Sequence, residues 1–554
     1  MHGQLKTTAH CRTEHRAVRN RIVHSESREK SRPMNDAATT RRTVGVVFWA
    51  SLSVSALFVV WGVAAPDHQT ASMNAALGWI TTRFGWTYLL LPLLLLVLLV
   101  GLACSRYGRI RLGSDEDRPE FATHTWIAMI LCAVMGIGLV SYGVAEPISH
   151  FATPPHGLAE AGTPQAAVLA LQYSFYDWGL HAWAIFAVFG LALGYSIHRK
   201  ERPGLVSALF RPLLGRHADG PAGKAIDILT VFATLFGTTT SLGLGALQID
   251  NGLNRLLGTP SGTTTQVVIV VVVTVLFSLS AASGVKRGIR YISEINLSVA
   301  SLLFVFVLFL GPTAFLVSLF LESIGQYGNE FLLMSLRGPA FGDIAWLQDW
   351  TYFMMAWWVS WGAFVGVFLA RISRGRTIRQ FILIVLGLPS LAFFTWFSVF
   401  GGSAIDLDMN HGTDIAGATA TEINSAFFVT LAEFPLPTVT AALVVILAAL
   451  FFISGADANT YVLGMLTTHG SIRPRTSILL LWGAMTGALA IILLLSGGLD
   501  ALQQTVTVSS APFLVIIVGV VVCFLRDLRS EGAVEPDVAP RHLEHVTPEG
   551  RKRM

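Results

Sequence analysis

Long runs without a charged residue are the feature that most restricts how this chain can fold. Residues 88–104 and 267–282, for example, are almost entirely aliphatic. A helix needs about 20 apolar residues to cross the hydrocarbon core of a bilayer, and comparable runs recur along the chain. Charged residues make up only 13% of the sequence, about half the share found in soluble proteins. The sequence therefore predicts an all-α polytopic membrane protein.

Hydropathy windows predict about twelve transmembrane helices. They cover residues 44–65, 86–104, 126–143, 167–197, 225–247, 266–282, 291–321, 351–370, 381–401, 438–454, 476–495 and 506–525. The polar flanks are predicted to be disordered tails. Met34 offers an alternative start, because the stretch before it has no structural pattern. The predicted organisation is a tail (1–43), a transmembrane domain (44–525) and a second tail (526–554).

The distribution of positive charge tests the number of spans independently. An even number places both tails on one side, together with the loops 105–125, 198–224, 283–290, 371–380 and 467–475. This set contains all of the 38 Lys and Arg residues except Arg83, Arg255 and Arg337. The positive-inside rule therefore predicts a multi-pass cell-membrane protein with both termini in the cytoplasm. The net charge of +4 follows from this topology and indicates no nucleic-acid binding. The basic tails either contact anionic lipids or are simply solvated.

Sequence motifs for catalysis or metal binding are absent. The chain has no His-Glu-x-x-His and no Gly-x-Ser-x-Gly motif, and its 4 cysteines lack metal-ligand spacing. We therefore predict that the protein is not an enzyme and has no catalytic residues, metal ligands or cofactor. No recurring filter sequence suggests a channel. Two classes of membrane protein remain: a transporter, and a membrane sensor without transport.

Aromatic residues cluster in two short apolar stretches, in the fourth and eighth predicted spans: Trp178, Trp183, Phe186, Trp357, Trp358 and Trp361. Indole faces are the best side-chain surface for a quaternary ammonium group. On a continuous helix Trp183 and Phe186 share a face, and Trp178 lies about 7.5 Å further along the axis. Tryptophans also pack at lipid headgroups, but two clusters within core segments favour an aromatic box for an onium ligand.

Small residues interrupt two spans near their middles, at 134–138 in the third and 360–363 in the eighth. Glycine permits an unwound backbone, which at membrane depth is tolerated only where it is buried in protein or lines a cavity. These spans are five apart, so we predict two inverted five-helix repeats, about 126–321 and 351–525, with a site between them. Close helix packing at glycine is the alternative.

Seven motifs are spread over about residues 44–525: YGRIRLG (107–113), MGIG (135–138), YGVAEP (142–147), WGLHAW (178–183), TSLGLG (240–245), AWW (356–358) and FLARISRGR (368–376). In these motifs the chain resembles the betaine/choline/carnitine transporter family. The resemblance implies a LeuT-like fold of twelve helices, usually a homotrimer, and secondary active transport of onium compounds. It implies a substrate site formed by the six aromatic residues and the unwound segment: Met135, Gly136, Ile137 and Gly138.

Two departures from the family pattern affect the expected substrate. Phe186 replaces a common tyrosine, and Gly138 stands where choline-specific relatives often carry aspartate. Choline is a bare cation that benefits from a nearby carboxylate, whereas a zwitterion brings its own. We therefore predict import of a betaine-like or carnitine-like zwitterion, as a compatible solute or a nutrient. A choline uptake transporter is the alternative.

The residues of the tenth predicted span indicate which ion is coupled to transport. Sodium sites of this fold use two hydroxyls there, but the matching pair is Ser454-Gly455, which lacks one hydroxyl ligand for a hard cation. Some sodium-independent relatives place a guanidinium at the ion position, and Arg290 could do so here, or it could be a plain cytoplasmic charge. Asp457 is an acid within the membrane, functional by default. We predict coupling to a proton or a counter-substrate, with Arg290, Ser454 and Asp457 as candidate ion-site residues. A sodium-coupled, osmoregulated symporter is the alternative.

Overall fold

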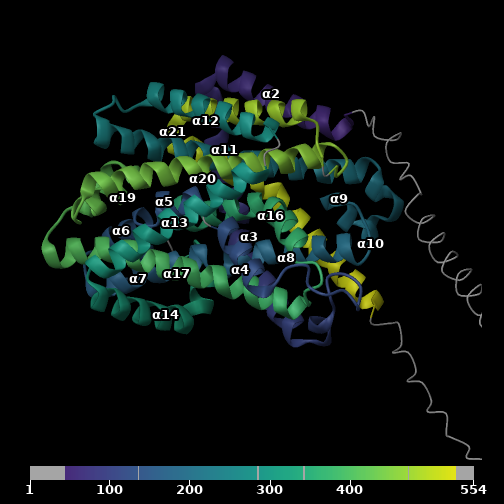
Figure 1. The fold of residues 1–554 in the computed structure, drawn as a ribbon, viewed down its shortest axis with the longest axis horizontal. Helices are drawn as coiled ribbons and strands as arrows, with labels where there is room; N and C mark the ends of the chain where they lie inside the picture. Colours follow the sequence, from purple (N-terminus) through teal and green to yellow (C-terminus); the bar gives the residue numbers. More distant parts are fainter. Residues whose placement is uncertain (1–43, 135, 284–285, 341–343, 472, 532–554) are drawn as a thin grey trace, which may run out of the picture. The chain divides into compact units, whose positions relative to one another are not determined.

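The computed structural model describes residues 44–134, 136–283, 286–340, 344–471 and 473–531 (Figure 1). Contacts divide the chain into two units, Met1–Val44 and Gly45–Met554, and the second contains all of the described helices. Among the described residues, nine helices are long and apolar enough to cross a membrane, or ten if one bent pair counts as a single span. The predicted all-α polytopic membrane protein is confirmed. The number twelve and the inverted repeats stay predictions.

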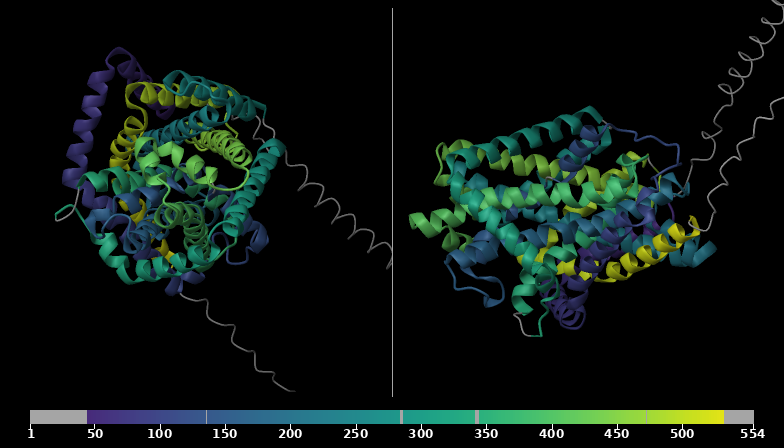
Figure 2. Two further views of the ribbon diagram at one scale, coloured as in Figure 1. Left: turned by 90° about the vertical axis from the view of Figure 1, so that its left-hand side faces the viewer. Right: turned by 90° about the horizontal axis from the view of Figure 1, so that it is seen from below.

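Several helices lie side by side with roughly parallel axes (Figures 1 and 2). The second unit contains both long and short helices. The long helices are α2 (Val46–Ala64), α3 (Pro66–Cys104), α7 (Pro164–Trp178), α8 (Leu180–His198), α11 (Pro221–Leu257), α12 (Thr263–Ser283), α13 (Lys286–Leu310), α14 (Thr313–Leu336), α16 (Phe353–Ile372), α17 (Ile378–His411), α20 (Pro437–Thr467) and α21 (Thr476–Glu531). Shorter helices are α4 (Thr123–Val134), α5 (Ile137–Tyr142), α6 (Ala145–Ala152), α9 (Val206–Leu209), α10 (Arg211–Leu214), α15 (Ile344–Leu347), α18 (Ile415–Thr421) and α19 (Ala426–Ala432).

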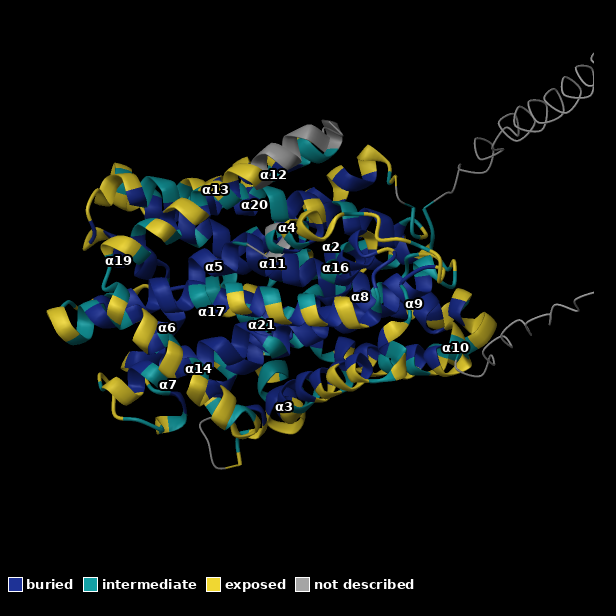
Figure 3. Ribbon diagram, turned by 60° about the horizontal axis from the view of Figure 1, so that its bottom comes forward, coloured by how far each residue is buried: buried dark blue, intermediate teal, exposed yellow. Residues whose placement is uncertain are grey.

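Burial separates inner helices from outer ones (Figure 3). In the most apolar windows, 89% of the residues are buried in Pro164–His198 and 83% in Pro221–Leu257, but only 28% in α2 and 22% in Thr263–Ala281. The outer helices are apolar all round, so their exposed faces suit contact with acyl chains. The inner helices α7, α8, α11 and α16 form the protein core that surrounds the site described below.

The third predicted span is broken where the sequence indicates. Helix α4 ends at Val134 and α5 begins at Ile137, and the intervening Gly136 has an extended backbone (φ −146°, ψ −179°). Met135 lies outside the described residues. The break separates the span into two short helices, and its second half faces the core.

The predicted interruption of the eighth span is wrong. Helix α16 continues from Phe353 to Ile372 through Gly362. A Cβ atom at Gly362 would lie 2.7 Å from Cε2 of Phe189 on α8. Glycine serves close helix packing here, which is the alternative interpretation of the small residues.

Two further breaks correct the predicted spans. The helix ends at Trp178 and restarts at Leu180, with Gly179 outside helical geometry (φ −96°, ψ −131°). Trp178 and Trp183 therefore belong to different helices, and the expectation that one helix carries both is wrong.

The predicted single span over residues 291–321 is also wrong. The chain forms two helices there, α13 and α14, whose axes meet at a bend of 105°. Pro312 stands at that bend and cannot continue a helical hydrogen-bond pattern.

Loops predicted to be cytoplasmic gather on one face. Arg199, after α8, pairs with Asp115 in the loop after α3 (2.8 Å) and with Glu531 at the end of α21 (2.7 Å). A backbone bridge between Arg111 and Thr377 joins the loop after α3 to the loop after α16. The C-terminal end of α21 thus shares a face with three basic loops, as the charge partition requires.

Substitution of Gly366 by alanine is expected to destabilise the contact between α8 and α16. An added Cβ would lie 2.5 Å from Phe189 Cβ and 3.0 Å from the Phe189 carbonyl carbon, which is backbone and cannot rotate away. Overpacking of this kind costs about 1–3 kcal/mol, and the melting temperature of the purified protein in detergent measures the loss. Gly387→Ala on α17 is the control, because nothing lies within 4 Å of its added Cβ. Equal melting temperatures for the two variants would contradict the packing role.

Candidate functional site

A largely apolar cavity lies within the second unit, between inner helices and α17. Every predicted substrate-binding residue that the structure describes lines this cavity: Gly136, Ile137, Gly138, Trp178, Trp183, Phe186, Trp357, Trp358 and Trp361. Met135 lies outside the described residues. Segments nearly 180 positions apart in the sequence therefore meet around one space.

The aromatic rings of the two clusters contact one another directly. The ring centroids of Trp178 and Trp358 are 4.9 Å apart with the planes at 73°. Trp357 stacks on Trp358 at 5.3 Å, and Phe186 meets Trp358 edge-on at 6.0 Å. The rings thus present faces in more than one direction, as a box around a rounded head group requires.

Phe393 on α17 is a wall of the cavity that sequence reasoning missed. Its ring centroid lies 5.4 Å from that of Trp178 and 6.2 Å from that of Trp183. It connects these two tryptophans, which the break at Gly179 places on separate helices. Nothing in the sequence distinguishes Phe393, since it stands in a run of several phenylalanines within the ninth predicted span.

Hydrogen bonds hold two of the indoles in place. The Trp178 Nε1–H donates to Glu146 Oε2 at 2.6 Å, and the Trp358 Nε1–H donates to the backbone oxygen of Asp177 at 2.7 Å. Both rings are therefore oriented by partners outside the cavity. In contrast, the buried Nε1 atoms of Trp357 and Trp361 have no hydrogen-bond partner among the described residues.

Gly138 allows the two clusters to approach each other. A Cβ atom there would lie 2.7 Å from Trp178 Cη2 and 3.2 Å from Trp357 Cη2. The edges of these rings occupy the space that any side chain would need. The aromatic walls of the cavity thus require a glycine at this position.

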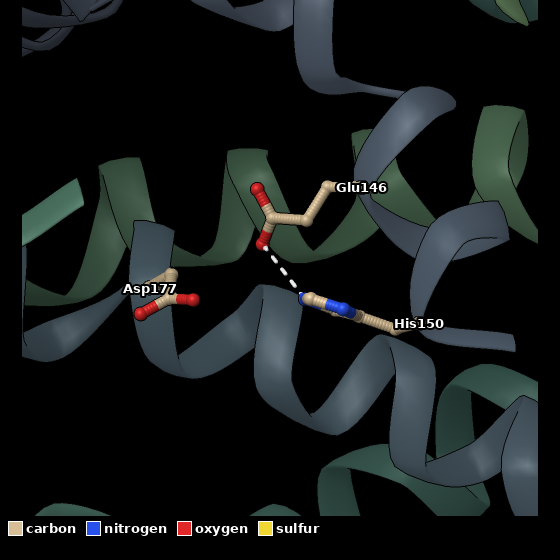
Figure 4. A group of neighbouring side chains, drawn as sticks. All are labelled: Glu146, His150 and Asp177. Atoms are coloured by element: carbon tan, nitrogen blue, oxygen red, sulfur yellow. Dashed lines mark ion pairs between the residues drawn. The ribbon is translucent and has the colours of Figure 1, made fainter. Parts of the chain in front are cut away.

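Two carboxylates and a histidine lie close together (Figure 4), and none of them belongs to the described lining of the cavity. Glu146 and His150 are on α6, Asp177 is at the end of α7, and all three are completely buried. One potential ligand atom of each lies within 4.8 Å of the others, and no further His, Cys, Asp or Glu of the described residues joins them. The sequence does not indicate that Glu146 and Asp177 meet, because they lie on different helices.

The candidate ion-site residues lie apart from the cavity lining. On α20, Ser454 Oγ donates to the backbone oxygen of Phe451 (3.2 Å), and Asp457 accepts a bond from Ser280 Oγ on α12 (2.9 Å). The space at Gly455 is open, with nothing within 4 Å of an added Cβ. Arg290 belongs to α13, but its side chain lies outside the described ones. The roles of Arg290, Ser454 and Asp457 stay predictions.

Comparison with known proteins identifies relatives over most of the chain. A family model described as "BCCT, betaine/carnitine/choline family transporter" matches residues 46–533. The glycine betaine transporter OpuD of Bacillus subtilis is 46% identical over 88% of this chain and 95% of its own length. The ectoine/hydroxyectoine transporter of Virgibacillus pantothenticus is 38% identical over 89% and 98%. The high-affinity choline transport protein of Escherichia coli is 35% identical over 94% and 76%.

Proposed function

Because the chain belongs to the betaine/carnitine/choline transporter family, we propose that it is a secondary active transporter that imports a betaine-like zwitterion. The observation that carries this proposal is the aromatic cavity shared by Trp178, Trp183, Phe186 and Trp358. A quaternary ammonium group cannot donate a hydrogen bond, so aromatic faces are the surface that retains it.

The expected affinity suits a transporter, which must also release its substrate. Each aromatic face contributes about 0.5–2 kcal/mol to cation binding when water is excluded. Three faces together with burial of the methyl groups reach about 4–8 kcal/mol, which corresponds to millimolar to micromolar dissociation constants. Tighter binding would slow release on the other side of the membrane.

A zwitterion fits the cavity better than choline does. No acidic residue belongs to the described lining, and Gly138 has no room for one. The unpartnered indole N–H groups of Trp357 and Trp361 are donors available to a carboxylate. Among the relatives, a glycine betaine transporter has a higher identity than a choline transport protein. Glycine betaine is therefore the first substrate to test, before carnitine, ectoine and choline.

For the driving force, we propose proton coupling or exchange without sodium. Gly455 supplies no hydroxyl where the resemblance implies a sodium ligand, and the space beside it is open. Arg290 is proposed to supply the positive charge at the ion position. We also propose that the face with Arg199 and Glu531 lies in the cytoplasm, and that the basic tails contact anionic lipids. A homotrimer is proposed from the resemblance alone.

Uptake of radiolabelled glycine betaine into proteoliposomes tests both statements. We expect uptake above that of protein-free liposomes, with the same initial rate when potassium replaces sodium on both sides. A second set preloaded with unlabelled betaine separates exchange from proton-driven uptake. Strict sodium dependence would overturn the coupling proposal while leaving the substrate proposal intact. Uptake of choline but not of betaine would instead favour the choline transporter.

A further inference from the structure

We propose that Glu146 and Asp177 together bind one exchangeable proton, and that this proton competes with the onium group of the substrate. The inference deepens the proposed function and rests on it, because the pair lies directly behind a wall of the proposed substrate cavity. Figure 4 shows the two carboxylates and His150 facing a common point between α6 and α7.

Unpartnered polar atoms are the first observation that supports the site. Glu146 Oε1, both Asp177 carboxylate oxygens and both His150 ring nitrogens are buried without a hydrogen-bond partner. The hydroxyl groups of Thr351 and Ser174 lie beside Asp177 and Glu146, respectively. Hydroxyl groups carry no charge, whereas buried charges are normally compensated. The group therefore lacks a positively charged component.

Protein side chains do not provide this compensation. None of the ion pairs of the described residues joins Lys or Arg to Glu146 or Asp177, and the closest base is His150, whose Nε2 lies 3.8 Å from Glu146 Oε1. Other titratable or charged groups act on the three residues directly or through a neighbour. They come from α5, α7, η2 (Pro155–Gly157), α14, the residue after α14 and η4 (Gln348–Tyr352): Tyr142, Tyr173, Tyr176, His156, Tyr327, Glu330, Arg337 and Tyr352. Arg337 acts on Tyr173 and not on the carboxylates.

A proton satisfies the pair better than a metal ion would. Two buried carboxylates close together cannot both stay ionised, and sharing one proton removes one charge. A hard metal ion requires about six oxygen ligands, but aromatic rings pack against this group. Trp346 and Trp350 lie 5.2 and 4.7 Å from the His150 ring, centroid to centroid. The proton needs no ligands beyond the two carboxyl groups.

Hydrogen bonds connect the pair to the substrate cavity on both sides. Trp178 donates to the Glu146 carboxylate, and Trp358 donates to the backbone of Asp177. An onium group in the cavity that these two rings line and a proton on the pair repel each other across the low-dielectric protein between them. Substrate binding therefore favours release of the proton to solvent, and a protonated pair weakens substrate binding. A proton symporter needs proton and substrate to bind together, so this competition disfavours proton symport and leaves exchange for a counter-substrate as the driving force for import.

Proton release on ligand binding is the decisive measurement. The purified full-length protein is mixed with choline or glycine betaine in weakly buffered detergent solution containing a pH indicator. We expect wild type to release protons, and its choline affinity to rise about tenfold from mildly acidic to mildly alkaline pH. Betaine should show a smaller rise, because its own carboxylate offsets the repulsion. Asp177→Asn should still bind both ligands, but without proton release and with a pH-independent affinity.

Controls distinguish the proton site from a purely structural role of the two carboxylates. They also distinguish failure of the proton site from failure of the proposed transport function. Asp227→Asn replaces another buried acid, which lies on α11 and is bonded to Ser207 on α9, and this variant should keep the proton release. Glu146→Gln serves as a second variant if Asp177→Asn does not fold. Infrared difference spectra between the two pH values should show a protonated carboxyl band that Glu146→Gln lacks, whether or not a ligand binds.

Several outcomes would overturn the inference. Betaine binding without proton release, proton uptake in place of release, or release that persists in both variants would each contradict it. Affinity that responds to sodium or to a chelator, and not to pH, would show a metal ion at the pair. If neither ligand binds and the carboxyl band is present, the proposed function fails while the proton site stands. Absence of the band together with absence of proton release removes the site itself.

Discussion

Replacing Trp358 with leucine is expected to weaken glycine betaine binding by about 30-fold, equivalent to about 2 kcal/mol. Leucine keeps much of the apolar volume but removes the indole face. Trp358 has a central position in the aromatic box, because its ring contacts those of Trp178, Trp357 and Phe186. The leucine variant also lacks the hydrogen bond from Trp358 to the backbone oxygen of Asp177. The end of α7, which carries Trp178, is then held less firmly.

Equilibrium binding of radiolabelled betaine is the appropriate measurement, because removing a tryptophan alters the fluorescence signal itself. Trp358→Phe, which retains a smaller aromatic face, should fall between wild type and the leucine variant. Trp49→Leu is the matched control, since Trp49 is 57% exposed on the outer helix α2. Unchanged binding in Trp358→Leu, or an equal loss in both leucine variants, would show that the rings are structural and do not hold the substrate.

Much of the fold could be predicted from apolar runs and charge. Apolar runs identify most of the long helices because a bilayer requires length and hydrophobicity whatever the tertiary contacts are. The basic loops that the charge pattern groups together do meet, through Arg199 and Glu531. The positions of helix breaks were harder to predict. Glycine permits both an unwound segment, as at Gly136, and close packing, as at Gly362 against Phe189. Only the neighbouring helix decides between them.

The candidate site likewise contains residues that the sequence identifies and residues that it does not. Tryptophans are rare and chemically specific, so Trp178 and Trp358 are recognisable from the amino-acid sequence alone. Phe393 is not, because a phenylalanine among phenylalanines carries no distinguishing signal. The meeting of Glu146 with Asp177 depends on how α6 packs against α7. Contacts of this kind between separate helices follow from three-dimensional packing, which local patterns in the chain do not determine.

A side chain at Gly138 is expected to disable the transporter, and aspartate there is not expected to create a choline transporter. The added Cβ would lie 2.7 Å from Trp178 Cη2 and 3.2 Å from Trp357 Cη2, so the rings must move or the segment must shift. Trp178 cannot shift freely, because its Nε1–H is bonded to Glu146 and its ring contacts Phe393. Displacement of one aromatic wall removes a contribution of about 0.5–2 kcal/mol to cation binding, which predicts a loss of betaine affinity of about 2- to 30-fold for Gly138→Ala.

Gly138→Asp should lose more than Gly138→Ala, since its carboxylate enters an apolar space without a partner. Binding of labelled betaine and labelled choline to each variant measures both affinities. Gly101→Ala on α3 is the control, because nothing lies within 4 Å of its added Cβ, and it should bind betaine as wild type does. Gain of choline binding by Gly138→Asp would show that the walls yield to a side chain at this position. The substrate preference would then depend on a single carboxylate, and the rigid aromatic cavity inferred from Trp178 and Trp357 would be wrong.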